Sequence, residues 1–384
     1  MTTRSFRSIA LFGSALTDGR EIERCRVSIA DGTFASIEPN ATARPGDVVV
    51  DGWIAPGLID LHVHGAGGVD LTAADDPERA VASVARSLAR RGVTAFCPTV
   101  SSARAETYAR AIPAYAPRAQ EGGAESLGVN LEGPFIDPSH RGFQDATVLR
   151  PASAEEVARW IALGPPMIVT LAPERPRGME ALRELVAAGV VVSLGHSGAN
   201  AEQARAALAE GARHGTHLFN AMPELHHREP GLVGALLGSD ATVEVIADGI
   251  HLHPQVVELV VRVAGPHRVC LVTDGLAAMG EPPGRSRMGD EWVISDGRAV
   301  RREDGTLAGT AVSLDECLRN ARRWLPWLEP AVVLRMATST PASVFGRTVA
   351  ERKGRIAPGY DADAILLDRE WNVTRTYVRG VAIS

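Results

Sequence analysis

Eight short apolar runs alternate with segments of helical periodicity through the middle of the chain, and this alternation restricts the fold more than any other feature. The runs are Leu58–His64, Thr94–Val100, Ser126–Glu132, Met167–Ala172, Val190–His196, Gly215–Phe219, Thr242–Ala247 and Arg268–Thr273. The helical segments include Pro77–Arg91, Gly178–Ala188, Ala201–Gly211 and Pro254–Ala264. Alternating strands and helices form parallel sheets, and eight such units predict an α/β fold closed into a (β/α)8 TIM-like barrel. The alternative is an open doubly wound sheet, but no G-x-G-x-x-G motif opens a first strand–helix unit.

Both ends of the chain differ from this central part. The first 55 residues contain short strand-like runs separated by turns, and the last 30 residues show the same pattern. Short strands bounded by turn residues are typical of antiparallel β-structure. The sequence therefore predicts a small β-domain formed by residues 1–55 and 355–384, with the barrel in residues 56–354.

Composition and charge exclude several classes of protein. The 384 residues are 45% apolar and 22% charged, as in ordinary globular proteins. A formal net charge of −6 provides no basic field, so neither nucleic acid nor a membrane surface is an expected partner. No apolar run reaches the length of about 18 residues that a membrane helix needs, and Met1–Arg20 lacks the apolar core of a secretory leader. We expect a cytoplasmic protein.

The cysteines support the same expectation. Cys25, Cys97, Cys270 and Cys317 are far apart in the sequence and form no C-x-x-C pair. This spacing favours buried thiols in a reducing compartment.

Histidines and carboxylates stand at the carboxyl ends of the apolar runs, where a barrel carries its active site. The first run ends in His62-Val63-His64. Alternate residues of a strand point to the same face, so both imidazoles are expected to enter the barrel mouth, where they suit one metal ion. A His-x-His pair is often incidental, but its position at the end of the first barrel strand favours a metal site.

Three further candidate ligands come from later runs. The third run ends at Glu132, the fifth ends at His196, and the sixth contains His217. A carboxylate at the top of a strand can hold one metal ion or bridge two, and its alternative is a helix cap or an ion pair. Either histidine alone would be interpreted as a core residue. Because the two occur at matching depth in successive strands, a shared metal site is the better prediction.

Asp274 follows the eighth run, in the segment Val272-Thr273-Asp274-Gly275. A lone carboxylate at the last strand can act as the general base of a hydrolase. Its alternative role is to orient a ligand electrostatically.

Several segments together resemble the N-acetylglucosamine-6-phosphate deacetylases of the amidohydrolase superfamily. The segment PGLIDLHVHG (56–65) is similar to the opening of amidohydrolase barrels. The other matching segments are LEGPFI (131–136), LAPE (171–174), SLGHS (193–197), THLFNAMP (216–223), REPG (228–231), ADGIHLHP (247–254), LVTDG (271–275) and LAGT (307–310). The matches run nearly end to end and in order. The resemblance implies a barrel with a small β-sandwich made from both chain termini, and a homodimer.

The resemblance also implies roles for individual residues. Glu132, His196 and His217 would hold the principal divalent metal, and His62 and His64 would complete a second site. The metal would be zinc, with iron or another divalent transition metal as the alternative, and one or two ions would bind. Asp274 would be the general base and acid. The expected substrate-binding residues are Gln144, Asn220, Ala221, Arg228, His251, Leu307, Ala308 and Gly309.

Two positions depart from the family pattern. Arg141-Gly142-Phe143-Gln144 stands where the family usually has Lys-Gly-x-His, whose histidine contacts the substrate near the reacting carbonyl. Gly275 stands where alanine is common. The first departure changes the type of a residue expected at the chemistry.

The implied activity is the hydrolysis of N-acetylglucosamine 6-phosphate, a small sugar phosphate, to glucosamine 6-phosphate and acetate. One alternative keeps the barrel and its metal but acts on another N-acetyl amino sugar or on an N-acyl compound. An inactive barrel that serves as a binding module is the alternative from another class. The sequence has candidates for every metal ligand and for the base, which disfavours that alternative.

Overall fold

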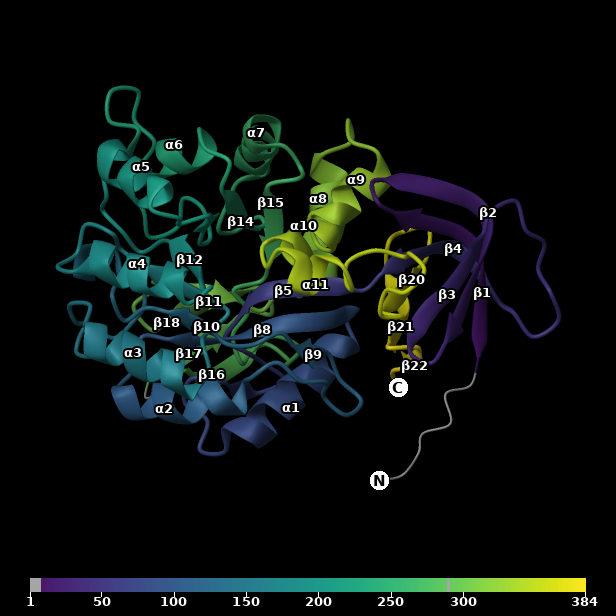
Figure 1. The fold of residues 1–384 in the computed structure, drawn as a ribbon, viewed down its shortest axis with the longest axis horizontal. Coiled ribbons are helices and arrows are strands. Elements are labelled where there is room, and N and C mark those ends of the chain that lie inside the picture. Colours follow the sequence, from purple (N-terminus) through teal and green to yellow (C-terminus); the bar gives the residue numbers. More distant parts are fainter. Residues whose placement is uncertain (1–7, 289–290) are drawn as a thin grey trace.

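The computed structural model describes residues 8–288 and 291–384, so the first seven residues of the expected 1–55 segment lie outside the described part. Two bodies lie side by side in Figure 1: a barrel surrounded by helices, and a smaller β-domain formed by strands from both ends of the chain.

Eight parallel strands form the barrel. In hydrogen-bonded order they are β5 (Leu58–Val63), β8 (Val93–Ser101), β10 (Asn130–Glu132), β11 (Ile168–Leu171), β12 (Val191–Leu194), β13 (His214–Gly215), β14 (Thr242–Ile246) and β15 (Val269–Val272). The first and last of these meet at their carboxyl ends. There the N–H of His64 donates to the Gly275 carbonyl at 2.9 Å, and the N–H of Asp274 donates to the His62 carbonyl at 2.9 Å. The predicted barrel is confirmed and is nearly closed.

The predicted strand in the sixth unit is wrong in its bounds. The run Gly215–Phe219 is apolar enough for a strand, but β13 covers only His214–Gly215. His217 and Phe219 have positive φ values of 27° and 76°. Left-handed backbone does not continue a β-ladder, so the chain leaves the sheet directly after Gly215. His217 therefore lies beyond the strand and not within it.

Helices cover the outside of the barrel. They are α1 (Pro77–Ala89), α2 (Ala105–Ala114), α3 (Ala154–Leu163), α4 (Gly178–Ala187), α5 (Ala201–Ala209), α6 (Gly231–Leu237), α7 (Pro254–Ala264), α8 (Leu314–Trp324), α9 (Pro330–Arg335), α10 (Ser339–Ser343) and α11 (Arg347–Ala350). Local sequence explains the first helix: Asp76 caps it by accepting from the N–H of Arg79 at 3.1 Å, and Pro77 occupies the first turn, where its missing N–H costs nothing. The four predicted helices are confirmed.

Strands from both ends of the chain form one seven-stranded sheet with the order β22–β21–β20–β4–β1–β2–β3. The strands are β1 (Ile9–Thr17), β2 (Arg20–Ala30), β3 (Thr33–Glu38), β4 (Val48–Pro56), β20 (Ala364–Leu367), β21 (Val373–Val378) and β22 (Val381–Ala382). The antiparallel pair of β4 and β20 joins the two chain ends, with Ile54 opposite Leu366. A separate buried cluster that includes Leu11, Phe34 and Tyr377 forms its core. The expected terminal β-domain is confirmed.

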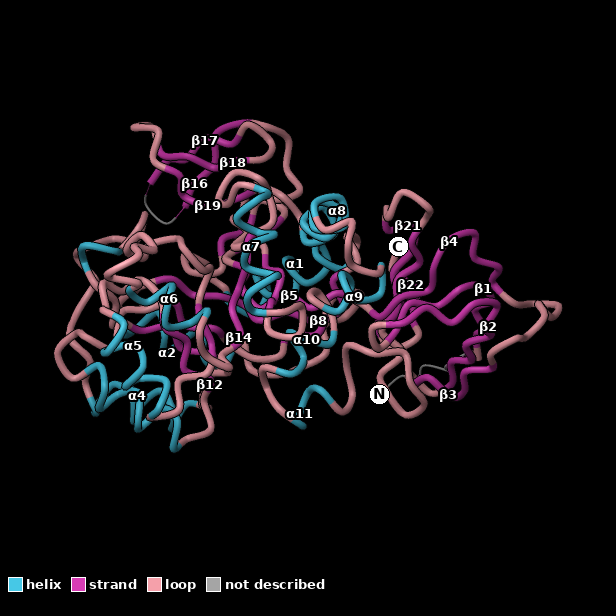
Figure 2. Tube along the Cα trace, turned by 90° about the horizontal axis from the view of Figure 1, so that it is seen from above, coloured by secondary structure: helices cyan, strands magenta, loops and turns pink. Residues whose placement is uncertain are grey.

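A four-stranded antiparallel sheet is inserted between β15 and α8, and the sequence analysis did not predict it. Its strands are β16 (Gly284–Met288), β17 (Glu291–Ser295), β18 (Ala299–Arg302) and β19 (Leu307–Thr310). Figure 2 shows the sheet projecting from the barrel on the side away from α10 and α11. An isolated bridge between Gly275 and Thr310 ties its last strand to the loop after β15. The insertion therefore lies beside the carboxyl ends of the barrel strands.

A buried ion cluster joins the barrel to the terminal β-domain. Lys353 is only 2% exposed, and its ammonium nitrogen lies 2.6 Å from Asp363, 2.9 Å from Asp361 and 3.0 Å from Glu125. Glu125 belongs to β9 (Glu125–Ser126), which pairs with β8, whereas both aspartates precede β20. Arg352 also contacts Glu125 and Asp361. Charges held this far from water are stabilising only while they remain paired.

The predicted free thiols are confirmed, because all four cysteines are unpaired and buried. Among the described residues, no helix combines the length and the apolar character that a membrane span requires.

Candidate active site

Five expected metal ligands and Asp274 meet at the carboxyl ends of the barrel strands. They form two sets that share Glu132, and within each set the ligand atoms lie within 4.8 Å of one another. The first set is His62, His64, Glu132 and Asp274, and the second is Glu132, His196 and His217. Because five strands and the turns after them supply these side chains, only the closed barrel brings the sets together.

Three of these residues occupy the same place relative to their strands. His196, His217 and Asp274 each lie two residues beyond the last residue of β12, β13 and β15. Each has a positive φ, at 48°, 27° and 53°. Non-glycine residues seldom adopt this conformation, which costs about 1–3 kcal/mol and clusters at functional sites. The turn directs each side chain back over the barrel mouth.

The contacts of Glu132 show how it is shared. Its Oε1 lies 2.9 Å from Nε2 of His196 and 2.9 Å from Nε2 of His217. Its Oε2 lies 3.3 Å from Nε2 of His64. Oε1 also lies 3.4 Å from Nε2 of His62, so Oε2 faces the first ligand set and Oε1 lies against both sets.

The outer nitrogens of two histidines have partners that determine where the ring proton sits. Nδ1 of His196 lies 2.8 Å from the His140 carbonyl, and Nδ1 of His62 lies 2.9 Å from the Glu244 carboxylate. Both partners only accept hydrogen bonds, so each Nδ1 must carry the proton, and in the neutral ring the Nε2 lone pair points into the site. This is the arrangement that metal-binding histidines use.

Electrostatics also favour a cation at this place. Burial alone would lower the pKa of His62, but Glu244, Glu132 and Asp274 outweigh it and raise that pKa well above its ordinary value. The pKa of His64 is raised to about 9, because Asp274 and Glu132 outweigh its burial. Burial opposes ionisation of Glu132, yet His196 and His62 hold its pKa well below the usual range. The buried carboxylates thus attract positive charge, whether protons or metal ions.

The residues fit a divalent metal on chemical grounds. Nε2 of His62 lies 3.1 Å from Nε2 of His64, and Nε2 of His196 lies 3.1 Å from Nε2 of His217. Two neutral imidazole nitrogens that face each other at this distance need a shared proton or cation between them. Imidazole nitrogen and carboxylate oxygen are the donors that zinc and similar transition metals prefer.

Two supporting residues were missed by the sequence analysis. Glu244, in β14, is 1% exposed and accepts from Nδ1 of His62 and from the N–H of His217 at 3.1 Å. Asp60 is fully buried and accepts from the Thr273 hydroxyl at 2.7 Å, which ties β5 to β15, and burial raises its pKa to about 7. A charged residue inside an apolar strand is costly without a partner, and this cost was the signal that could have identified both residues.

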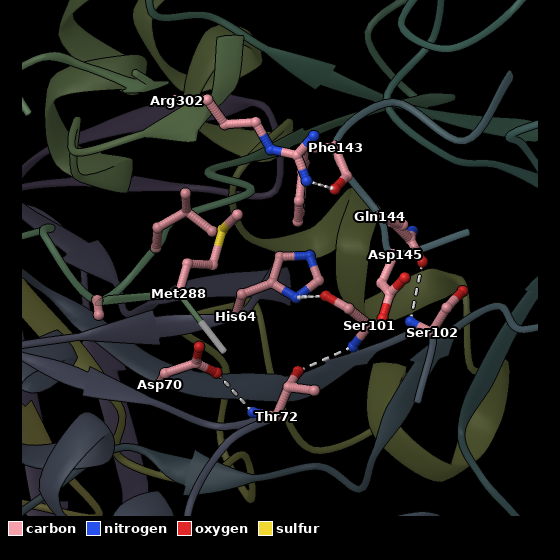
Figure 3. Close-up of a pocket in the computed structure, with 12 residues that line it drawn as sticks. His64, Asp70, Thr72, Ser101, Ser102, Phe143, Gln144, Asp145, Met288 and Arg302 are labelled. Carbon is pink, nitrogen blue, oxygen red and sulfur yellow. Dashed lines mark hydrogen bonds between the residues drawn. The ribbon is translucent and has the colours of Figure 1, made fainter. Parts of the chain in front are cut away.

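A cavity of about 320 Å³ opens beside the first ligand set. His64 and Gln144 line it from the barrel, and Met288 and Arg302 line it from the inserted sheet (Figure 3). Arg302 donates to the carbonyl of Phe143 at 2.5 Å, so the inserted sheet is tied to the segment that carries Gln144. The cavity is large enough for a small polar substrate next to His64.

The expected phosphate-binding residues do not line this cavity. Arg228 is exposed, with Nη1 2.8 Å from Nε2 of His227, and His251 is held by Asp248 at 2.7 Å. The amide of Asn220 donates to the carbonyl of His217 at 3.1 Å within its own turn. In the part of the chain that the structure describes, no contact joins Arg228 to His251. The structure therefore brings the ligands together but not the phosphate contacts.

The expected segment Leu307–Gly309 lies in β19, against the loop that carries Asp274. A Cβ added at Gly309 would stand 2.9 Å from the Leu276 side chain and 3.1 Å from the Asp274 carbonyl, so only glycine fits there. A Cβ at Gly275 would stand 2.7 Å from the Met279 methyl group and 3.0 Å from the Thr273 hydroxyl. The Met279 methyl group is the end of a flexible side chain that can move, so nothing in the structure explains why glycine replaces the alanine common in the family.

A barrel whose carboxyl-terminal mouth holds two buried ligand sets around one glutamate defines a metal-dependent hydrolase. The chain belongs to the amidohydrolase family, which matches residues 53–383. It is therefore a hydrolase of amide bonds.

Individual relatives narrow the class. The chain is 39% identical over 342 residues to an N-acetylglucosamine-6-phosphate deacetylase from Danio rerio, covering 85% of this chain and 83% of the relative. It is 37% identical over 373 residues to an N-acetylgalactosamine-6-phosphate deacetylase from Escherichia coli O157:H7, covering 95% and 96%. A solved N-acetyl-D-glucosamine-6-phosphate deacetylase variant from Mycobacterium smegmatis, in complex with N-acetyl-D-glucosamine-6-phosphate, superposes with a TM-score of 0.88 at 30% identity, covering 98% and 99%.

Proposed function

We propose that this protein hydrolyses N-acetylglucosamine 6-phosphate to glucosamine 6-phosphate and acetate. The observation that carries the proposal is the pair of ligand sets around Glu132, with Asp274 facing both histidines of the first strand beside a cavity. Relatives named for this activity span nearly the whole chain.

The two ligand sets would hold two divalent ions. The imidazole and carboxylate donors suit zinc. Glu132, His196 and His217 would hold one ion, and His62, His64 and Asp274 would hold the other with Glu132 shared. When bound, such ions lower the pKa of water toward about 7 and polarise a carbonyl oxygen. Both effects answer the difficulty of amide hydrolysis, in which a weak nucleophile meets a poorly electrophilic carbonyl.

Asp274 would move the proton. Its Oδ1 lies 3.2 Å from Nε2 of His64 and 3.5 Å from Nε2 of His62, and the charge of His62 helps to hold its pKa below the ordinary value despite burial. The carboxylate is therefore ionised and ready to accept a proton from the attacking water. It would return that proton to the nitrogen of the departing amine, so that the C–N bond breaks with a neutral amine as leaving group.

The phosphate would be bound by a local cation, because the chain as a whole is negatively charged. We assign this role to Arg228 and His251, together with Asn220 and Ala221, since a planar guanidinium suits a phosphate dianion. Because Arg228 is exposed and not yet beside His251, its loop would have to close over the substrate. Leu307–Gly309 and Gln144 would lie near the sugar and its acetyl group.

The galacto epimer is a second candidate substrate. The relative named for N-acetylgalactosamine 6-phosphate aligns with 95% of this chain at nearly the same identity as the relatives named for the gluco sugar. The two sugars differ only in the orientation of one hydroxyl group, and no residue described above distinguishes them.

Acetate release tests both candidates. The metal-loaded enzyme is assayed with N-acetylglucosamine 6-phosphate, its galacto epimer and the two unphosphorylated sugars, and kcat/KM is compared. We expect the highest value for the gluco 6-phosphate and a large loss without phosphate. No acetate from either sugar phosphate at saturating metal would overturn the proposal, and a higher value for the galacto sugar would reassign the substrate.

Three further properties complete the proposal. We infer a homodimer and a cytoplasmic location, the first from the family resemblance and the second from the free buried cysteines. We place the domain boundaries at residues 1–55 with 355–384 for the β-domain and 56–354 for the barrel. Light scattering and limited proteolysis test the oligomeric state and the boundaries.

A further inference from the structure

The orientation of the Glu132 carboxylate decides whether it can serve both ligand sets. Oε1 faces His196 and His217 and lies 3.4 Å from Nε2 of His62, whereas Oε2 faces His64. A rotation of the carboxylate about its last bond would therefore move Oε2 away from His64. That terminal torsion of a glutamate is broad and is not restricted by a staggered minimum. A shared orientation therefore needs a restraint from outside the ligand sets.

Gln144 supplies such a restraint. It is 2% exposed, and its Nε2 donates to Oε2 of Glu132 at 2.8 Å. The amide could in principle be turned over, but its Oε1 accepts from the backbone N–H of Ser102 at 2.8 Å, as Figure 3 shows. A backbone N–H can only donate, so the oxygen must face Ser102 and the nitrogen must face Glu132.

The position of Gln144 is itself firmly held. Its backbone N–H donates to the Arg141 carbonyl at 3.1 Å, and its own carbonyl accepts from Nη1 of Arg141 at 2.6 Å. The Ser102 hydroxyl donates to the backbone carbonyl of Glu132 at 3.4 Å, which links the two partners of the amide. Protein groups alone therefore hold the amide in place.

We propose that Gln144 is a positioning residue that holds Glu132 in the orientation needed to share its two oxygens between two metal ions. An ionised carboxylate has about four lone-pair sites, so the amide can occupy one site on Oε2 and leave the other for an ion. Because the amide is neutral, it restrains Glu132 without adding a competing positive charge. The inference rests on the proposed function and concerns the ion held by His62, His64 and Asp274.

Metal titration of the metal-free protein tests this role. We expect wild type to bind two equivalents of Zn²⁺. Gln144→Leu keeps the bulk of the side chain but removes the hydrogen-bond donor. It should lower the affinity of the first set for Zn²⁺ by about 10- to 100-fold, the usual effect of losing a partner of a metal ligand. Binding of the ion of the second set should stay within about threefold of wild type, because Oε1 retains both histidines and the Gln144 amide nitrogen approaches Nε2 of His196 only at 3.4 Å.

Matched variants separate positioning from general damage. Gln144→His keeps an N–H donor and should restore the second equivalent, whereas Gln144→Asn is too short to reach and should behave as the leucine variant does. Met288→Leu lines the same cavity without contacting Glu132 and should bind two ions normally. If the leucine variant does not fold, the asparagine variant carries the same comparison.

The outcomes are distinct. Two ions bound by Gln144→Leu with wild-type affinities, or equal weakening of both, would overturn the role of Gln144. If wild type binds fewer than two ions, Glu132 is not shared between two ions and the proposal fails. Acetate release by wild type judges the proposed function separately from either result.

Discussion

Removing the charge of Glu244 while keeping its shape should weaken the binding of the metal ion that His62 would hold. Oε2 of Glu244 accepts from His62 and from the backbone N–H of His217, and Oε1 lies 3.2 Å from Nε2 of His214. In Glu244→Gln the amide oxygen can keep the first two bonds. The amide nitrogen would then donate to His214, whose Nδ1 can donate to the Thr242 hydroxyl at 2.6 Å. The substitution therefore removes charge without removing a hydrogen bond.

The expected magnitude follows from the kind of bond that changes. A hydrogen bond to a charged group contributes about 1.5–3 kcal/mol and a neutral one about 0.5–1.5 kcal/mol. The midpoints of these two ranges differ by about 1.3 kcal/mol for the bond between Glu244 and His62, which is close to tenfold in affinity. The carboxylate makes the His62 ring a stronger donor of electrons to a metal, so this loss should fall on the first ligand set.

The assay is a titration of the metal-free variant with Zn²⁺ in the presence of a competing chelator at neutral pH. Glu156→Gln is the matched control, because that glutamate is also largely buried but pairs with Arg150, outside both ligand sets. For the Glu244 variant we expect the first ligand set to bind Zn²⁺ roughly tenfold more weakly than in wild type. The control should bind both ions with unchanged affinity. Affinities within twofold of wild type for both ions would refute the argument.

Three further predictions concern catalysis, recognition and stability. Asp274→Asn should keep the ion held by Glu132, His196 and His217 but lower kcat for acetate release by about 10²- to 10⁴-fold, because an amide cannot accept the proton; a loss below fivefold would remove Asp274 from this role. Arg228→Ala should lower kcat/KM on the phosphorylated sugar far more than on its unphosphorylated counterpart, and equal losses would make Arg228 structural. Lys353→Met should lower the free energy of unfolding in urea by about 3–5 kcal/mol, because it removes the cation beside buried Asp363 and leaves Glu125 and Asp361 with Arg352 alone; a change below 1 kcal/mol would contradict this. In wild type, Glu125 and Asp361 have lowered pKa values because their cationic partners outweigh burial. The stability that these two carboxylates contribute should therefore be complete above the ordinary carboxyl pKa of about 4 and be lost as the pH falls below it. A urea series from pH 6 to pH 3 measures this loss. If Lys353→Met loses as much stability as wild type over that range, the pH-dependent stability does not come from this cluster.

Several features of the fold could be predicted because they are written into short segments. The strands β20 and β21 lie in the last 30 residues, where short strands were expected, because short apolar runs between turn residues define them locally. The inserted sheet could also have been found. Ser295-Asp296-Gly297 joins two runs of β-branched and alternating residues, which is a hairpin signal.

The bounds of β13 show the opposite case. Gly215–Phe219 is apolar enough for a strand, yet the chain leaves the sheet because His217 adopts a positive φ. No local preference of histidine requires that conformation. Its cost is met by contacts with residues far away in the sequence, such as Glu132 and Glu244.

The sequence by itself determined which side chains end the barrel strands, because alternation of apolar and helical segments and the residue types at strand ends are local properties. Only the tertiary structure decided that Glu132 faces two ligand sets, that Gln144 restrains it, and that Glu244 holds His62 across 182 residues. It also left Arg228 exposed and apart from the cavity. The physical reason is that these contacts arise when β5 meets β15 and the barrel closes, and the distances between strand ends then depend on backbone turns and packing that no single segment encodes.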